Sequence, residues 1–293
     1  MKSAPFAYSR PADVDEACAL LAADDGARVI AGGQSLVPMM AMRLAWPTRL
    51  VDIARIASLS YVRDEKDAVA IGACTRQCAI ERDQVVARRL PLLARTMPFI
   101  GHGATRARGT IGGSLAHADP AAELPLIAVT LDATLSYRLN GNTGDIAARD
   151  FFQGLMMTAL PAGACLASVR FPVWPGEVGS GFHEVNARRS DFAFVAAAAQ
   201  VQLDEDGKCR RIAIGVGAAT ATPIRLGAAE KALTGTVLGG KQVADAVRDA
   251  LSDIEPLDDL HASAAYRRRA AAALAARAVA DAKTDAERAR HAH

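Results

Sequence analysis

The segment AGGQSLVPMM, residues 31–40, places two adjacent glycines between an apolar strand and an apolar helix. The strand lies in ARVIAGG (27–33), and Ser35 stands at the candidate cap of the helix. A second apolar strand, TRLVDI, follows at 48–53. A strand–helix–strand order in so short a stretch predicts a small βαβ unit with parallel strands. Residues 10–26, just before it, have helical periodicity between a proline and a glycine.

A second glycine pair occurs in TIGGSLAHADPAAELP, residues 110–125. Backbone N–H groups at a strand-to-helix junction converge on one point and carry the positive end of the helix dipole, which suits a phosphate. Glycine permits close approach because it has no Cβ. One such pair alone is explained better by a tight turn that needs a positive φ. Two pairs, each followed by a nearby serine, favour two loops that hold the pyrophosphate of one ligand.

Two other segments, GHGATR (101–106) and GVGAAT (215–220), begin like the G-x-G-x-x-G fingerprint of Rossmann dinucleotide sites. Arg106 and Thr220 stand where the third glycine belongs, and the second segment falls within a predicted strand. The sequence also contains no Walker phosphate loop. These features argue against a Rossmann-type NAD site.

The remaining pattern is that of an α+β protein. Strands are expected at 68–73 and 165–173. Two helices are expected after the first of them, one from Thr75 and one through RRLPLLARTM (88–97). Asn140-Gly141 is a favoured two-residue turn between the strands of a hairpin. The Pro- and Gly-rich stretch 174–181 is a candidate domain boundary. Beyond it we predict a hairpin turn at 203–208 and helices over 227–234, 240–252 and 262–285.

Composition narrows the classes of function. The chain has 293 residues, of which 51% are apolar and 23% charged, and its formal net charge of +2 gives no electrostatic reason to bind nucleic acid. Its five cysteines form no CxxC pair, so we predict no zinc, iron–sulfur or other metal site in this chain. No signal peptide or long apolar run is recognisable, and we expect a cytoplasmic protein without an integral membrane segment.

Four segments carry a resemblance to a known family: FAYSRPADVDEACALLA, RVIAGGQSLVPMMAMRLAWPTRLVDI, RARGTIGGSLAHADPAAELP and SAAYRRRAAAAL. Together they are similar to the FAD-binding medium subunit of molybdenum hydroxylases, the carbon monoxide dehydrogenase medium-subunit and xanthine dehydrogenase FAD-subunit family. The resemblance covers essentially the whole chain. It implies a FAD-binding domain of the vanillyl-alcohol oxidase type at 1–176, in two parts (about 1–55 and about 56–176). A C-terminal α+β domain with an antiparallel sheet and helices would follow at 177–293.

The resemblance also implies FAD as the cofactor and the residues that bind it. Both glycine motifs would hold the FAD pyrophosphate. Glu123 would contact the ribityl chain, with Asp119 in the same turn. Leu166 would lie near the adenine or the flavin, and Phe192 beside the isoalloxazine ring. The motif residues are Ala31, Gly32, Gly33, Gln34 and Ser35 in the first motif and Thr110, Ile111, Gly112, Gly113 and Ser114 in the second.

The chain departs from the family pattern at two places. Phe192 lacks the hydroxyl of the tyrosine that some relatives have, which bears on flavin potential and access. The segment GHGATRARG (101–109) replaces the commoner G-D-P-Q-V-R-N-R-G. It retains Arg106 and Arg108 but loses the carboxylate and the asparagine, which bears on the acceptor side. His102 and His117 flank the second motif, and positioning or ordinary loop contacts explain them better than catalysis. A flavin that only relays electrons needs no general base, so we predict no catalytic residue.

The resemblance implies an oxidoreductase, namely the electron-transfer subunit of a multi-subunit molybdenum hydroxylase. Substrate would react at a molybdenum cofactor on a large partner subunit. Electrons would pass through 2Fe–2S clusters on a small partner to this FAD and then to an external acceptor, in a dimer of heterotrimers. Two alternatives stay open: a free-standing FAD-dependent oxidase or reductase of the same fold, and a nucleotide-binding scaffold without redox chemistry. The lack of a cluster motif in this chain favours the first reading.

Overall fold

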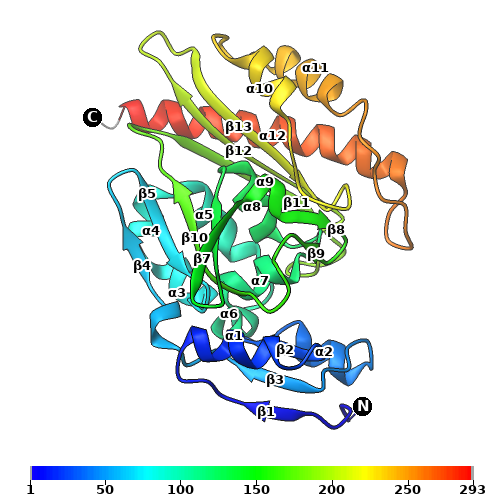
Figure 1. Ribbon diagram of the computed structural model, residues 1–293. Helices are drawn as coiled ribbons and strands as arrows, with labels where there is room; N and C mark the ends of the chain where they lie inside the picture. The colour runs from blue at the N-terminus through cyan, green and yellow to red at the C-terminus, as the bar shows by residue number, and fades with distance from the viewer. Residues whose placement is uncertain (1, 292–293) are drawn as a thin grey trace.

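The computed structural model describes residues 2–291, and its three main sheets form three tiers that follow the order of the chain (Figure 1). The N-terminal tier lies at one end of the molecule, and the C-terminal tier, which contains the long last helix, lies at the other. The middle tier separates them, so a site between the first two tiers brings together residues far apart in the sequence.

The N-terminal tier is a parallel sheet in the order β1–β3–β2. Its elements are β1 (Ala7–Ser9), α1 (Val14–Ala22), β2 (Ala27–Ile30), α2 (Leu36–Ala41) and β3 (Arg49–Asp52). The unit β2–α2–β3 is the predicted βαβ unit, and β1 is a strand that the sequence pattern missed. Helix α1 begins at Asp13, whose carboxylate accepts a hydrogen bond from the Glu16 N–H, while the Glu16 carboxylate accepts one from the Ala12 N–H.

The middle tier is an antiparallel sheet in the order β4–β5–β10–β6–β7, covered by short helices. Its strands are β4 (Val62–Asp64), β5 (Ala68–Gly72), β6 (Thr134–Leu139), β7 (Asn142–Ala147) and β10 (Cys165–Pro172), with β8 (Phe152–Gly154) and β9 (Met157–Thr158) paired separately. Its helices are α3 (Gln77–Arg82), α4 (Gln84–Arg89), α5 (Pro91–Thr96), α6 (Gly103–Arg108), α7 (Ile111–His117), α8 (Glu123–Thr130) and α9 (Ala148–Phe151), with 3-10 turns η1 (Ala57–Leu59) and η2 (Met97–Phe99). The predicted hairpin is confirmed: Asn140 and Gly141 have φ of 50° and 76°, as its two-residue turn requires.

The segment after β5 forms three short helices where the sequence suggested two. Asp83 interrupts the first, because its backbone is extended and its carboxylate accepts hydrogen bonds from the N–H groups of Val85 and Val86. Pro91 starts the third helix at a position where its missing N–H costs nothing. The Asp83 cap and Pro91 therefore divide this segment into more helices than its hydrophobic periodicity alone predicts.

The C-terminal tier is an antiparallel sheet in the order β11–β12–β13–β14. Its elements are β11 (Gly179–Val185), β12 (Val195–Leu203), β13 (Cys209–Gly217), β14 (Ile224–Arg225), α10 (Gly227–Leu233), α11 (Gly240–Ala250) and α12 (Ala264–His291). The three predicted helices and the hairpin between β12 and β13 are present, although α12 extends beyond the predicted end at residue 285. Helix α12 packs on one side of the sheet. Helices α5 and α8 of the middle tier also pack against strands of this sheet.

Burial explains the apolar character of this last sheet. Every residue of β12 is buried, because alternate side chains join two different hydrophobic clusters. Glycines in β11 allow α12 to lie directly on the strand: a Cβ at Gly181 would lie 2.0 Å from the Ala278 carbonyl oxygen.

The predicted domain boundary at 174–181 contains a buried residue, Trp174. The Arg211 guanidinium lies over the Trp174 ring. The domain bounds themselves stay a prediction.

Candidate functional site

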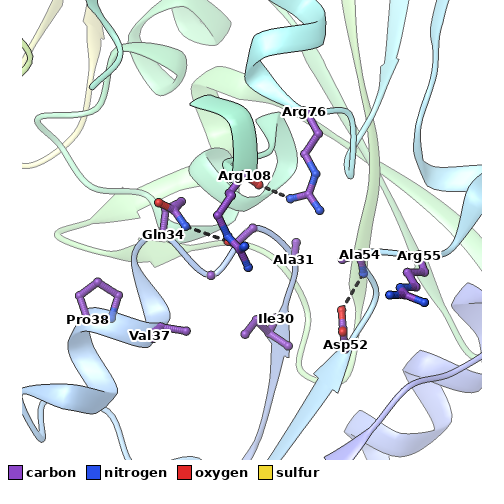
Figure 2. A pocket seen from close by; sticks show the side chains of 12 residues that line it. Ile30, Ala31, Gln34, Val37, Pro38, Asp52, Ala54, Arg55, Arg76 and Arg108 are labelled. Atoms are coloured by element: carbon purple, nitrogen blue, oxygen red, sulfur yellow. Dashed lines mark hydrogen bonds between the residues drawn. The ribbon is translucent and has the colours of Figure 1, made fainter. Parts of the chain in front are cut away.

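A cavity of about 600 Å³ opens between the N-terminal and middle tiers (Figure 2). The first glycine motif lines it with Ala31, Gly32, Gly33 and Gln34, directly after strand β2. The end of β3 adds Asp52, Ala54 and Arg55, and the middle tier adds Arg76 and Arg108. The cavity thus lies at the carboxyl edge of the parallel sheet, where open α/β units commonly bind ligands.

The backbone of the first motif presents unused donors. In residues 2–291, none of the N–H groups of Gly32, Gly33, Gln34 and Ser35 donates to another protein atom. Gly33 has a φ of 71°, a backbone conformation that would be strained for a residue with a side chain. The Gln34 side-chain amide stabilises the turn by donating a hydrogen bond to the Gly32 carbonyl oxygen at 3.1 Å. Ser35 is the N-cap residue of α2, as expected, but its hydroxyl makes no capping hydrogen bond. The loop suits an anion.

Three guanidinium groups add positive charge around this loop: Arg55, Arg76 and Arg108. In Figure 2 the Arg76 side chain donates to the Arg108 carbonyl oxygen, and the Arg108 side chain extends toward the first motif. The cavity contains one carboxylate, Asp52, whose two oxygens accept from the Ala54 N–H and the Tyr8 hydroxyl. The surplus of positive charge matches a ligand with more than one negative charge.

Sequence reasoning noted Arg108 as a retained family residue but missed Arg55 and Arg76 as cavity residues. A signal for Arg55 existed, because it follows the second strand of the predicted βαβ unit, and the carboxyl ends of parallel strands meet at one edge. No comparable signal existed for Arg76, which reaches the cavity from the antiparallel middle tier.

The second glycine motif differs from the expectation. It follows helix α6 instead of a strand, and Gly112 and Gly113 lie in the first turn of α7. The Gly112 N–H donates to the Ala73 carbonyl oxygen at 2.9 Å, and the Gly113 N–H donates to the Thr110 hydroxyl at 3.1 Å. A Cβ at Gly112 would lie 2.4 Å from the Ala73 Cβ, so this glycine is needed for packing. The prediction that the second glycine pair forms a strand-to-helix junction with free N–H groups is therefore wrong.

Two more N–H groups of that motif are also used: Ile111 donates to the Thr75 carbonyl oxygen at 3.2 Å, and Ser114 to the Thr110 carbonyl oxygen at 3.2 Å. The second motif is nevertheless held beside the first. A Cβ at Gly32 would lie 2.5 Å from the Arg108 carbonyl oxygen and 2.9 Å from the Gly109 Cα. The bare Gly32 thus lets the two segments touch, although Thr110 to Ser114 do not line the cavity.

The other predicted binding residues lie outside the cavity lining. Glu123 is buried at the start of α8, and burial, then repulsion by Asp119, raises its pKa to about 7. The Asp119 carboxylate accepts from the Ala121 N–H at 2.9 Å and shapes the turn before α8. Leu166 packs in the largest hydrophobic cluster with 6% exposure, whereas Phe192 is 66% exposed. Their roles at a cofactor stay predictions.

Within the described part of the chain, no three His, Cys, Asp or Glu side chains are arranged to hold a metal ion. No helix within residues 2–291 has the length and apolarity to cross a membrane.

Comparison with known proteins gives the family. Residues 4–174 match the family described as FAD binding domain in molybdopterin dehydrogenase. Residues 180–282 match the CO dehydrogenase flavoprotein C-terminal domain. The chain belongs to the family of FAD-binding medium subunits of molybdenum hydroxylases, which includes the CO dehydrogenase medium chain. The predicted resemblance is confirmed.

Relatives match over nearly the whole chain. The carbon monoxide dehydrogenase medium chain of Afipia carboxidovorans is 37% identical over 285 residues, covering 96% of this chain and 98% of that one. The 6-hydroxypseudooxynicotine dehydrogenase complex subunit alpha of Paenarthrobacter nicotinovorans is 37% identical over 268 residues, covering 91% and 90%. These relatives are dehydrogenase subunits, which confirms the predicted oxidoreductase class.

Solved structures agree with this assignment. A chain of carbon monoxide dehydrogenase from Hydrogenophaga pseudoflava superposes with a TM-score of 0.94 at 32% identity, covering 97% of this chain and 99% of that one. A chain of quinoline 2-oxidoreductase from Pseudomonas putida 86 superposes with a TM-score of 0.93 at 35% identity, covering 98% and 99%. The predicted α+β class, with a FAD-binding domain followed by a C-terminal antiparallel sheet, is confirmed.

Proposed function

We propose that this chain is the FAD-carrying electron-transfer subunit of a multi-subunit molybdenum hydroxylase. In this proposal a small partner subunit with 2Fe–2S clusters delivers electrons to the chain, and an external acceptor removes them. A large partner with the molybdenum cofactor oxidises the substrate, and the assembly is a cytoplasmic dimer of heterotrimers. The observation that supports this most directly is the cationic cavity with unused backbone donors, in a chain whose family binds FAD.

The residues present fit a dinucleotide diphosphate. The four free N–H groups of the first motif would donate to one phosphate, and the guanidinium groups of Arg55, Arg76 and Arg108 would balance the charge of both. The Ser35 hydroxyl is free of a capping role and adds a donor. From the neighbouring second motif, Ser114 offers a half-buried hydroxyl, whereas the backbone of Gly112 serves packing.

The flavin end of FAD would extend from this cavity toward Glu123 and Phe192. Glu123 would meet the ribityl chain, Phe192 would cover the isoalloxazine ring, and Leu166 would contribute an apolar edge. When bound, FAD supplies one- and two-electron redox chemistry, which lets a subunit connect single-electron carriers to varied acceptors. The chain itself would orient the cofactor and shield it from water.

Two measurements on the full-length chain test this function. Purified chain mixed with FAD and then freed of unbound flavin by gel filtration should stay yellow, with one flavin bound per chain, whereas a nucleotide scaffold without redox chemistry should elute without flavin and release a colourless nucleotide. Affinity purification of the tagged chain from its own cells should then yield two further polypeptides with stoichiometric molybdenum and iron. A flavin-loaded chain that purifies alone and oxidises a small molecule unaided would refute the proposal in favour of a free-standing oxidase or reductase.

A further inference from the structure

Asp52 places a carboxylate in a cavity that otherwise suits anions. It lines the same cavity as the first glycine motif and the guanidinium groups of Arg55, Arg76 and Arg108. Within residues 2–291, Asp52 forms no ion pair with any of these three guanidinium groups. A carboxylate repels a nearby phosphate, so a cavity that bound only phosphates would gain nothing from Asp52. Its presence indicates that the ligand also offers hydrogen-bond donors.

Two neutral donors hold the Asp52 side chain in place. One carboxylate oxygen accepts a hydrogen bond from the Ala54 N–H at 2.9 Å, and the other accepts one from the Tyr8 hydroxyl. A carboxylate has about four lone-pair positions, so about two stay available for further donors. Asp52 is half-buried and lines the cavity, so a ligand in the cavity can reach its carboxylate.

The parallel sheet places Asp52 beside the first motif. Strand β3 lies between β1, which carries Tyr8, and β2. Ile30, the last residue of β2, is the register partner of Asp52, and the two residues lie at the same edge of the cavity (Figure 2). The first motif begins directly after Ile30. Because neighbouring strands are about 4.8 Å apart, the carboxylate lies one strand away from the loop proposed to hold a phosphate.

This arrangement is the one found in mononucleotide-binding βαβ units. In such units a glycine turn after the first strand binds a phosphate. An acidic residue after the second strand, about 20 residues further on, accepts a hydrogen bond from a ribose hydroxyl. Asp52 is the last residue of β3 and stands 20 positions after Gly32. The glycine spacing differs from the G-x-G-x-x-G fingerprint, but the place of the acceptor depends on strand order and register, and both are present.

We propose that Asp52 binds the adenosine half of FAD and that its carboxylate accepts a hydrogen bond from a ribose hydroxyl. Tyr8 is then a positioning residue, because its hydroxyl orients the carboxylate. The inference rests on the proposed function, since it requires FAD as the ligand. It assigns a binding role to a residue outside both glycine motifs, and it explains why a cationic cavity retains a carboxylate.

The first part of the test changes the ligand and leaves the protein intact. FAD bound to the full-length chain is displaced by ADP, 2′-deoxy-ADP, 3′-deoxy-ADP or inosine diphosphate, and flavin fluorescence reports the displacement. At least one deoxy analogue should bind about tenfold more weakly than ADP, because it lacks the proposed donor. Inosine diphosphate keeps both ribose hydroxyls and lacks the adenine amino group, so it should bind within about threefold of ADP.

The second part removes the acceptor. Asp52→Ala should bind FAD and ADP about tenfold more weakly and should no longer distinguish ADP from its deoxy analogues. Inorganic pyrophosphate has no ribose, so it should bind Asp52→Ala at least as tightly as wild type, because a repulsive charge is gone. Asp150→Asn is the control, since Asp150 is an exposed carboxylate on α9, and all its affinities should equal those of wild type. Circular dichroism establishes that both variants are folded.

Several results would overturn the inference. Equal wild-type affinity for ADP and both deoxy analogues would remove the ribose contact, and so would failure of ADP to displace FAD. Tighter binding of FAD to Asp52→Ala would mean that the carboxylate only repels the ligand. A loss confined to inosine diphosphate would assign Asp52 to the adenine amino group instead. A wild-type chain that binds no FAD would refute the proposed function itself, so the two failures are distinguishable.

Discussion

Replacing Gly32 with alanine tests the contact between the first glycine motif and the Arg108–Gly109 segment just before the second motif. The new Cβ would lie 2.5 Å from the Arg108 carbonyl oxygen and 2.9 Å from the Gly109 Cα. Both are backbone atoms, which cannot rotate away as a side chain would. Gly32 does not have a positive φ, so alanine introduces no backbone strain of its own. Any effect of Gly32→Ala therefore reports the steric contact between the tiers.

The magnitude follows from the distances. An ordinary carbon contact needs roughly 3.5 Å, so the first motif must move about 1 Å away from the Arg108–Gly109 segment. Overpacking of this kind lowers the free energy of unfolding by about 1–3 kcal/mol. A shift of about 1 Å also takes a backbone N–H out of hydrogen-bond range of a phosphate. Losing one charge-assisted bond costs about 1.5–3 kcal/mol, which weakens FAD binding from about tenfold to more than a hundredfold.

The assay measures thermal unfolding without ligand and the FAD dissociation constant by flavin fluorescence. Gly240→Ala is the matched control, because Gly240 is the first residue of α11 and has no heavy atom within 4 Å of its would-be Cβ. This control should leave FAD binding unchanged and unfold at the same or a slightly higher temperature. The reasoning is refuted if Gly32→Ala binds FAD like the control and unfolds at the wild-type temperature.

Three further changes follow from the same structure. Arg108→Gln should weaken FAD binding about tenfold and reduce its salt dependence, whereas Arg149→Gln, on an exposed residue paired with its neighbour, should leave fluorescence titrations unchanged. Gly181→Ala should lower the unfolding temperature strongly, because its Cβ would meet the Ala278 carbonyl oxygen at 2.0 Å; a melting curve like the wild type would contradict the packing of α12 on β11. Burial, then repulsion by the Glu123 carboxylate, raises the folded-state pKa of Glu184 on β11 from 4.5 to about 8, so folding takes up a proton in that window and stability falls as the pH rises through it. Glu184→Gln without FAD should therefore gain in unfolding temperature relative to wild type toward pH 9, and a constant difference across pH would count against the raised pKa.

Local sequence determined the elements that depend on neighbouring residues. The βαβ unit follows from the apolar strands on either side of residues 31–40, and the Asn140-Gly141 turn follows from the positive φ that both residues tolerate. Four segments in the expected order along the chain, two of which contain the glycine motifs, were sufficient for the family and for FAD as its cofactor. The free N–H groups of the first motif were also predictable, because they arise within one strand–helix connection.

Tertiary structure decided which glycines line the cavity and which serve only packing within the protein. Gly112 and Gly113 read like the first pair in sequence, yet Gly112 is packed on Ala73 and its N–H is already bonded. Arg76 and Glu184 gave no sequence signal, because each gains its place from a different tier of the fold. Hydrogen-bond partners, close contacts and raised pKa values depend on distances between segments far apart in the chain. A local pattern fixes the conformation of its own few residues and carries no information on what the rest of the chain places against them.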